Sequence, residues 1–140
     1  MNHLFLDTDV ILDLLTDRKP FSDDIAEIFD LAVEKKVMLH SSALALSNAF
    51  YILRKVASPR KILEQFRKLI TIVRMTEMNH DVVTAALGSS FTDFEDALQN
   101  FSALQQSGIG IILTRNTKDY KNSSLIVLSP EMYLRQFPAS

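Results

Sequence analysis

Carboxylate and carboxamide side chains follow two apolar runs of this chain that have the character of buried strands. Leu4-Phe5-Leu6 leads directly into Asp7, with Asp9 close behind, and the run from Ile109 to Leu113 leads toward Asn116. In an open parallel α/β sheet, ligands gather outside the carboxyl ends of the strands. Oxygen ligands suit a hard cation such as Mg²⁺, which keeps several of its waters, so a few carboxylates suffice. The sequence therefore predicts a metal site at this edge of a sheet.

A further acidic group opens a predicted helix over residues 93–106, which Gly108 should close. At about 100° per residue, its apolar stripe comprises Phe94, Ala97, Leu98, Phe101 and Leu104. A second stripe beside it comprises Asp93, Asp96 and Asn100. Thr92 and Glu95 match a capping box, and acids favour the amino end of a helix, which accounts for Asp93 but poorly for Asp96. We interpret Asp96 as functional, and Asp93 equally as a helix-start acid or a ligand.

The sequence assigns a site role to some of the remaining polar residues more clearly than to others. Asp7 ends a buried strand and is interpreted as a metal ligand, whereas Asp9 is expected to cap the next helix or to support the site. Asn48 is the strongly polar residue of an otherwise apolar helix, where it could be either a hydrogen-bonded core amide or a site residue. Asn116 could equally be a turn residue. Asp119 is a candidate ligand, a supporting group or a surface residue, and the sequence does not separate these.

Basic residues are concentrated between positions 54 and 74, although the net charge of the chain is −2. Seven of the fifteen lysines and arginines lie there, against the single acid Glu64. We call this set the basic stripe: Arg54, Lys55, Arg60, Lys61, Arg67, Lys68 and Arg74. Such a stripe is what an RNA backbone would contact, and the first six residues are the predicted RNA-binding set. The other interpretation is a solvated helical face.

Length and composition predict one globular domain over residues 1–140. No apolar run approaches the roughly 18 residues of a membrane span, and the first residues lack the basic region of a signal peptide. The chain has no cysteine, so it has neither disulfides nor a thiolate metal site. From these features we expect a cytoplasmic protein with no membrane partner.

Apolar periodicity predicts alternating strands and helices along the whole chain. The expected strands are residues 3–6, 37–39, 70–73, 109–113 and 125–128. The expected helices are 10–15, one opened by Pro20, 43–56, 59–69, 79–88, 93–106 and a short one from Pro130. Ser41 or Ser42 should cap the helix over 43–56, which is apolar nearly all round and should be largely buried. Strands alternating with helices predict an α/β fold with a parallel sheet and helices on both faces.

Three motifs in this order resemble the PIN domain, the fold of VapC-type toxin ribonucleases. They are Phe5-Leu6-Asp7-Thr8-Asp9-Val10-Ile11-Leu12-Asp13-Leu14-Leu15, Asp96-Ala97-Leu98, and Thr114-Arg115-Asn116-Thr117-Lys118-Asp119-Tyr120. The resemblance covers nearly the whole chain and implies a five-stranded sheet of order 3-2-1-4-5. It also implies acids that bind Mg²⁺ or Mn²⁺ to hydrolyse RNA, and for a toxin it implies an antitoxin partner and a homodimer.

Residue by residue, the resemblance places the family's first aspartate at Asp7 and its helix aspartate at Asp96. The family's glutamate falls at Asn48 and its aspartate after the fourth strand at Asn116, so two anionic oxygens are replaced by neutral ones. We therefore predict a catalytic set of Asp7, Asp96, Asn48 and Asn116. The predicted metal ligands are Asp7 and Asp96 in direct contact, with Asp93 or Asp119 holding metal-bound water.

Two functions follow from this set. The first is a metal-dependent ribonuclease, in which the carboxamides orient ligands or the scissile phosphate. The second is a degenerate, non-catalytic PIN domain that binds RNA or a protein. Asp7-Thr8-Asp9 also suits haloacid dehalogenase-type phosphatases, but the acidic pair that those enzymes need late in the chain is missing. A receiver domain would need an aspartate after the third strand, where Arg74-Met75-Thr76-Glu77 stands.

Overall fold

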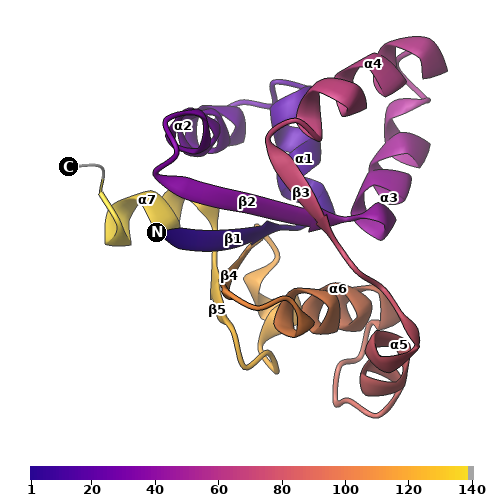
Figure 1. Ribbon diagram of the computed structural model, residues 1–140. Coiled ribbons are helices and arrows are strands. Elements are labelled where there is room, and N and C mark those ends of the chain that lie inside the picture. The colour runs from indigo at the N-terminus through magenta and orange to yellow at the C-terminus, as the bar shows by residue number, and fades with distance from the viewer. Residues whose placement is uncertain (139–140) are drawn as a thin grey trace.

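A computed structural model describes residues 1–138 of the chain, and its five strands form one parallel sheet in the order β3-β2-β1-β4-β5. The strands are β1 (Asn2–Leu6), β2 (Val37–Ser42), β3 (Val73–Thr76), β4 (Ile109–Leu113) and β5 (Ile126–Leu128). The helices are α1 (Thr8–Leu15), α2 (Phe21–Val33), α3 (Ala43–Leu53), α4 (Pro59–Leu69), α5 (His80–Leu87), α6 (Phe94–Gln105), the 3₁₀ helix η1 (Thr117–Tyr120) and α7 (Pro130–Gln136). The predicted α/β class and strand order are confirmed (Figure 1).

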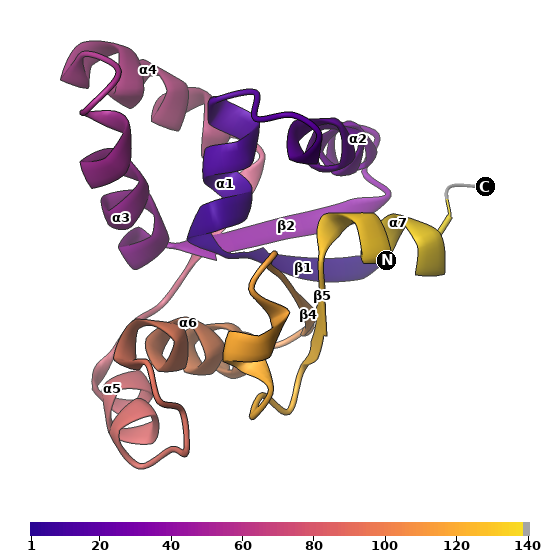
Figure 2. The same cartoon turned by 180° about the vertical axis from the view of Figure 1, so that it is seen from behind.

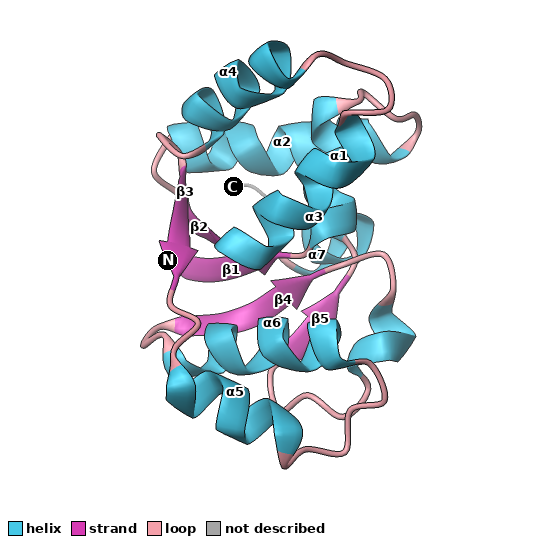
Figure 3. Cartoon of the chain, turned by 90° about the vertical axis from the view of Figure 1, so that its right-hand side faces the viewer, coloured by secondary structure: helices cyan, strands magenta, loops and turns pink. Residues whose placement is uncertain are grey.

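The sheet separates two helical layers, which follows from the alternation of side chains along its central strand. Leu4 and Leu6 of β1 belong to the core shared with α1, α2, α3, α4 and α7. Phe5, between them, belongs to a second core that contains Ala103 of α6 and Tyr120 of η1. Figure 3 shows the sheet edge between these layers, with α5 and α6 on the side opposite α1 and α2. From Leu4 to Leu6, β1 is buried on both faces and apolar, and Asp7 follows its last residue.

The third strand lies three residues later than predicted. Residues 70–73 form a continuous apolar run, but Ile70 ends α4 with its backbone N–H donated to Phe66, and β3 begins only at Val73. Val73 then pairs with Leu39 of β2. A short apolar run has no periodicity of its own, so its pattern cannot distinguish the end of a helix from a strand. The prediction of 70–73 as a strand was therefore wrong.

Helix α3 is shorter and more exposed than predicted. It ends at Leu53 rather than near residue 56, and it buries only Ala45, Ala49 and Leu53, which recur every four residues. Tyr51 and Ile52 are 56% and 49% exposed. Ser42 caps it, as one of the two predicted residues, by accepting a hydrogen bond from the Ala45 backbone at 3.1 Å. Leu46 and Phe50 pack partly against the core, so the exposed apolar surface of the helix lies mainly at Tyr51 and Ile52.

The carboxyl ends of β1 and β4 lie side by side in the middle of the sheet, where the chain reverses its strand order. The first turns of α3 and α6 lie at the same end of the sheet on opposite faces, as the two views in Figures 1 and 2 agree. A crevice outside the carboxyl ends of the strands at such a switch point is the usual ligand position in open α/β folds. Within residues 1–138, no helix is both long and apolar enough to cross a membrane.

Candidate active site

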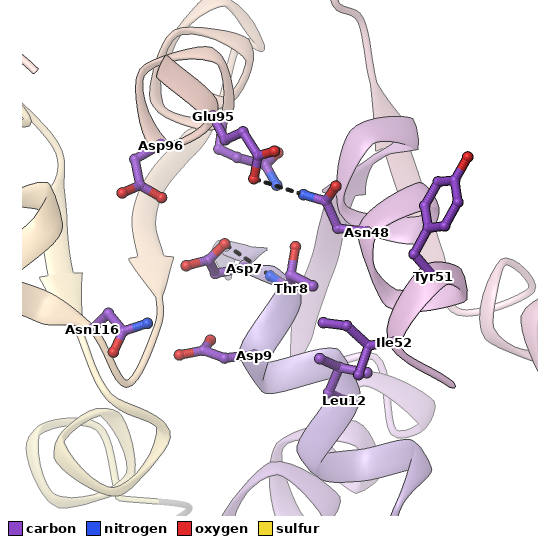
Figure 4. Close-up of a pocket in the computed structure, with 11 residues that line it drawn as sticks. Asp7, Thr8, Asp9, Leu12, Asn48, Tyr51, Ile52, Glu95, Asp96 and Asn116 are labelled. Carbon is purple, nitrogen blue, oxygen red and sulfur yellow. Dashed lines mark hydrogen bonds between the residues drawn. The ribbon is translucent and has the colours of Figure 1, made fainter. Parts of the chain in front are cut away.

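A cavity of about 420 Å³ opens at this switch point, between α1, α3 and α6. Its lining comprises Asp7, Thr8, Asp9, Leu12, Asn48, Tyr51, Ile52, Glu95, Asp96, Gln99 and Asn116. All members of the predicted catalytic set, Asp7, Asp96, Asn48 and Asn116, are among them. Figure 4 shows the carboxylates of Asp7, Asp9 and Asp96 directed toward a common space, with Asn48 across the cavity from them. The structure therefore brings together residues that lie up to 109 positions apart in the chain.

Asp7 is held rigidly at the junction of β1 and α1. Its backbone N–H donates to Leu113 of β4, and its carboxylate accepts hydrogen bonds from the Thr8 backbone at 2.8 Å and the Thr114 hydroxyl at 2.9 Å. Burial raises the pKa of this carboxyl, and the bonds from Thr114 and Thr8 oppose that rise. Asp7, and not Asp9, is the N-cap of α1, so of the two roles expected for Asp9 the capping role is excluded.

Asp9 lies in the first turn of α1 and faces the loop after β4. Its Oδ2 accepts a hydrogen bond from the Arg115 backbone at 3.0 Å and a longer one from the Thr114 hydroxyl at 3.4 Å. Burial, and then the charge of Asp7, raises the pKa of Asp9 to about 6. Its other oxygen, Oδ1, is buried and has no hydrogen-bond partner in the described part of the chain. Asp9 is thus a supporting residue with one oxygen left free for a ligand.

Asp96 lies in the first turn of α6, half-buried at the cavity wall. Burial, followed by the negative charges of Asp93, Asp7 and Asp119, raises its pKa to about 7. Asp93 caps the helix by accepting a hydrogen bond from the Asp96 backbone at 3.0 Å, so the predicted capping box of Thr92 with Glu95 does not form. Asp93 and Asp119 are both exposed and neither lines the cavity, although the Asp96 carboxyl senses both charges.

The buried face of α6 is mostly polar, and of the predicted apolar stripe only Ala97 is buried. Gln99, Asn100 and Ser102 are each 2% exposed or less, whereas Phe94 and Leu104 are 49% and 43% exposed. The buried side chains bond to hydroxyl groups of Ser42, Ser123 and Thr76, respectively. Hydroxyl groups at the carboxyl ends of β2 and β3 and in the loop after η1 face these residues, whereas Ala103 of the same helix packs in the core with Phe5. Sequence periodicity alone could not show that these hydroxyl groups lie opposite α6.

Asn48 is not a core amide. It is half-buried, and its Nδ2 donates a hydrogen bond across the mouth of the cavity to Oε2 of Glu95 at 3.1 Å (Figure 4). Glu95 was missed as a site residue because a capping box accounted for it in the sequence. Asn116 is exposed at the other side of the cavity, where its backbone N–H donates to the Thr114 hydroxyl at 3.1 Å. The cavity therefore contains the carboxylate of Glu95 beside the neutral amide of Asn48.

An ion pair behind the cavity was also missed. Arg115 donates to the buried carboxylate of Asp13 through Nε at 2.6 Å and Nη2 at 3.2 Å. Its guanidinium carbon lies 4.1 Å from the ring centroid of Phe21. Because the Arg115 backbone holds Asp9, this pair fixes the loop after β4 against α1. In the sequence, Arg115 could be recognised only as an arginine within the third motif, and nothing there indicated that Asp13 is its partner.

The basic stripe is fully exposed and lies apart from the cavity lining. It occupies the end of α3, helix α4 and strand β3, and Arg60 pairs with Glu64 at 3.5 Å. Arg54 lies closest to the cavity, since its guanidinium sits 4.6 Å from the ring centroid of the lining residue Tyr51. Arg74 instead lines a separate cavity with His40. The stripe adjoins the site at one end only.

The oxygen donors of the cavity fit a hard cation such as Mg²⁺ or Mn²⁺. Within residues 1–138, no three acidic or histidine side chains lie close enough together to hold a metal ion by themselves. Asp7 and Asp96 supply two carboxylates, and Mg²⁺ keeps waters for its other positions. Two buried oxygens have no hydrogen-bond partner in the described residues: Oδ1 of the lining residue Asp9 and the hydroxyl of Tyr120, which does not line the cavity. Burial and the charges of Asp7 and Asp96 raise the pKa of Tyr120, so its hydroxyl keeps its proton and can donate.

Comparisons with known proteins agree with this fold. No curated protein sequence matches the chain. The structure is similar to VapBC2 from Rickettsia felis bound to a DNA fragment from its promoter, with a TM-score of 0.65 and 14% identity over 89% of this chain and 96% of that one. It is similar to VapBC-1 from nontypeable Haemophilus influenzae, with a TM-score of 0.66 and 15% identity over 92% and 98%.

A third similar structure is Mycobacterium tuberculosis VapC20, described as a sarcin-ricin loop cleaving toxin, with a TM-score of 0.59 and 19% identity over 78% and 86% of the two chains. At these identities the similarities establish the fold. The sequence itself matches the profile of the PIN domain over residues 3–118, which is most of its length. With the sheet order and the aspartates that end β1 and open α6, this match shows that the chain belongs to the PIN domain family.

Proposed function

We propose that this chain is a metal-dependent ribonuclease that hydrolyses RNA phosphodiester bonds, and that it is the toxin of a toxin–antitoxin pair. The observation that carries the proposal is the convergence of Asp7, Asp96, Asn48 and Asn116 on one cavity at the switch point of the sheet. The similarity to VapC20, whose described substrate is an RNA loop, favours RNA as the substrate.

In this proposal Asp7 and Asp96 hold Mg²⁺ or Mn²⁺. When bound, the cation supplies an activated water and stabilises the charge that develops on the phosphoryl group. Thr8 and Thr114 keep the Asp7 carboxylate at a fixed position, so its remaining lone pairs face the cavity. Asn116 and the Asn48–Glu95 pair, on opposite sides of the cavity, orient the scissile phosphate. Asp93 and Asp119 act from outside through their charge or through water.

We extend the proposal to the partners of the chain. The basic stripe guides the RNA backbone toward the Tyr51 end of the cavity, with an affinity that falls as salt rises. An antitoxin, a homodimer and a cytoplasmic location are part of the same proposal. The toxin–antitoxin complexes of Rickettsia felis and Haemophilus influenzae share the fold, and the exposed apolar residues Tyr51 and Ile52 of α3 offer a contact surface for such a partner.

A Mn²⁺ titration by calorimetry tests the proposal, with Asp7→Asn as the site variant. Glu27→Gln, an exposed acid of α2 that does not line the cavity, is the matched control for the loss of one charge. We expect saturable binding in the wild type and in the control, and none in Asp7→Asn. Cleavage of structured and single-stranded RNA in Mg²⁺ should then require Asp7 and Asp96. Cleavage by Asp96→Asn at the wild-type rate would refute the assignment.

A second candidate function is a non-catalytic PIN domain that binds RNA or a protein. The observation that favours it is the pair of neutral amides, Asn48 and Asn116, together with the lack of a three-acid cluster within the described residues. The same titration separates the two candidates. If no Mn²⁺ binds up to millimolar concentration while RNA still binds, the non-catalytic module is the correct function.

A further inference from the structure

Gln99 is a buried polar residue of the cavity wall that the proposed mechanism does not use. It lies in the middle of α6 with only 2% of its surface exposed, and it lines the cavity. Its buried neighbours Asn100 and Ser102 do not line the cavity. Gln99 is therefore the residue through which the polar face of α6 reaches the candidate site.

The hydrogen bonds of Ser42 fix which end of the Gln99 side chain faces the cavity. Ser42 Oγ accepts a hydrogen bond from the Ala45 backbone at 3.1 Å, in its role as the N-cap of α3. Its hydroxyl proton is then free to donate, and its partner is Oε1 of Gln99. With the oxygen bound to Ser42, the Nε2 amide group is turned away from β2. Since a hydroxyl carries one proton, this arrangement satisfies Ser42 and leaves the amide protons for another partner.

No hydrogen bond within residues 1–138 uses Nε2 of Gln99, although the side chain is almost fully buried. Nε2 is not one of the fully buried polar atoms that lack a partner, so the amide group reaches the open cavity and can donate to a ligand there. The other lining groups nearby are the carboxylates of Asp7, Glu95 and Asp96, which only accept hydrogen bonds when ionised. An amide can donate to an anionic ligand here without neutralising the carboxylates, whereas a lysine would pair with them.

We propose that Gln99 is a substrate-binding residue whose Nε2 donates a hydrogen bond to a non-bridging oxygen of the phosphodiester in the cavity. The identity of the ligand as RNA rests on the proposed function. The contact links two elements, because the Ser42 hydroxyl that caps α3 also orients the amide that meets the phosphate. Gln99 thereby makes the affinity for the phosphodiester depend on the hydrogen bond between the α3 cap, Ser42, and α6.

The test separates this binding role from a purely structural link between α3 and α6. Gln99→Glu keeps an oxygen for Ser42 but replaces the donor with an acceptor, and Gln99→Leu removes both. Gln105→Glu, exposed at the end of α6, is the control for an added charge. Affinity is measured with a single-stranded 2′-O-methyl oligoribonucleotide in Mg²⁺, because this probe binds without being cut. Thermal unfolding is recorded for each variant.

We expect Gln99→Glu and Gln99→Leu to weaken oligonucleotide binding about tenfold, the usual effect of losing a hydrogen bond to a charged group. Mn²⁺ affinity should be retained in Gln99→Leu and should not fall in Gln99→Glu, which adds a carboxylate to the cavity lining, and Gln105→Glu should bind the probe like the wild type. In the wild-type protein, the ¹⁵N-labelled side-chain amide of Gln99 should shift on titration with the probe. That measurement needs no substitution, so it remains decisive if a variant fails to fold.

Unchanged probe affinity in Gln99→Glu, or a Gln99 amide resonance that does not move at saturation, would overturn the inference and leave the nuclease proposal standing. Conversely, a wild type that binds the probe through Gln99 but cuts no RNA would remove the nuclease proposal alone. A wild type that binds no probe would overturn the inference, and the Mn²⁺ titration would still decide between the two candidate functions.

Discussion

Replacing Arg115 should destabilise the protein more than replacing its partner Asp13. The Asp13 side chain is 3% exposed and that of Arg115 is 25% exposed. Arg115→Met keeps most of the apolar stem but leaves the Asp13 carboxylate buried without the two bonds at 2.6 and 3.2 Å. Removing one member of a buried ion pair costs about 3–5 kcal/mol. Because water reaches the arginine, we expect the lower end, about 3 kcal/mol.

Asp13→Asn should be milder, at about 1–2 kcal/mol, because the partly exposed guanidinium can turn toward water and the amide keeps the shape of the carboxylate. The double variant should cost less than the sum of the single ones, since the second substitution removes a group that the first left unpaired. Arg135→Met is the matched control. Its pair with Glu131 is exposed on both sides, and surface pairs contribute about 0–1 kcal/mol.

The assay is urea unfolding followed by circular dichroism, with unchanged slopes required before the free energies of unfolding are compared. If Arg115→Met costs less than about 1 kcal/mol, or costs less than Asp13→Asn, the asymmetry argument is refuted. Arg115 also holds Asp9 through its backbone. A loss of stability in Arg115→Met should therefore be accompanied by weaker Mn²⁺ binding, which Arg135→Met should not show.

Three further predictions concern charge at the candidate site. Mn²⁺ affinity should rise about tenfold between pH 6 and pH 8, because the Asp96 carboxyl, with its pKa raised to about 7, must lose its proton before it binds a metal. Calorimetry should detect the released proton. The Asp96→Asn variant should show neither the pH dependence nor the proton release. Glu95→Gln should weaken Mn²⁺ binding about fivefold. Adding Asn48→Glu should restore the affinity, because the negative charge returns at the other end of the same hydrogen bond. A double variant that binds Mn²⁺ as weakly as Glu95→Gln would show that the charge of Glu95 does not act on the metal. Charge reversal at Arg60 and Lys61 should weaken RNA binding and lower the salt slope by about 2 without changing Mn²⁺ affinity; unchanged RNA affinity would exclude the stripe.

The raised pKa of Asp96 also has a consequence for stability in the absence of metal. In the folded protein this carboxyl stays mostly neutral below about pH 7, whereas in the unfolded chain it ionises near the ordinary aspartate pKa of 3.8. Its contribution to stability is therefore present at low pH and is lost as the pH rises from about 4 to about 7. A bound cation favours the ionised form and should reverse this trend.

Local sequence pattern was sufficient for four of the five strands, for the strand order through the resemblance, and for the positions of Asp7 and Asp96 at the ends of their elements. The position of an aspartate at the end of a buried strand can be predicted from the sequence, because it depends on that one strand only. The same holds for Ser42, whose capping role is set by the helix that it begins. These features depend on periodicity and on neighbours along the chain.

Local pattern failed where two elements had to meet. The buried polar face of α6, the exposure of Tyr51 and Ile52, and the start of β3 at Val73 each depend on what lies across an interface. The burial of a side chain depends on the element that packs against it. The periodicity of one helix or strand does not predict the polarity of that neighbouring element.

What the sequence determined by itself is the fold class and the acids that end β1 and open α6. What only the tertiary structure decided is which groups surround those acids. Asn48 meets Glu95 across 47 positions, Ser42 meets Gln99 across 57, and Arg115 meets Asp13 across 102. The shifted pKa values of Asp9 and Asp96 have the same origin, since burial and nearby charges arise only when distant segments pack together.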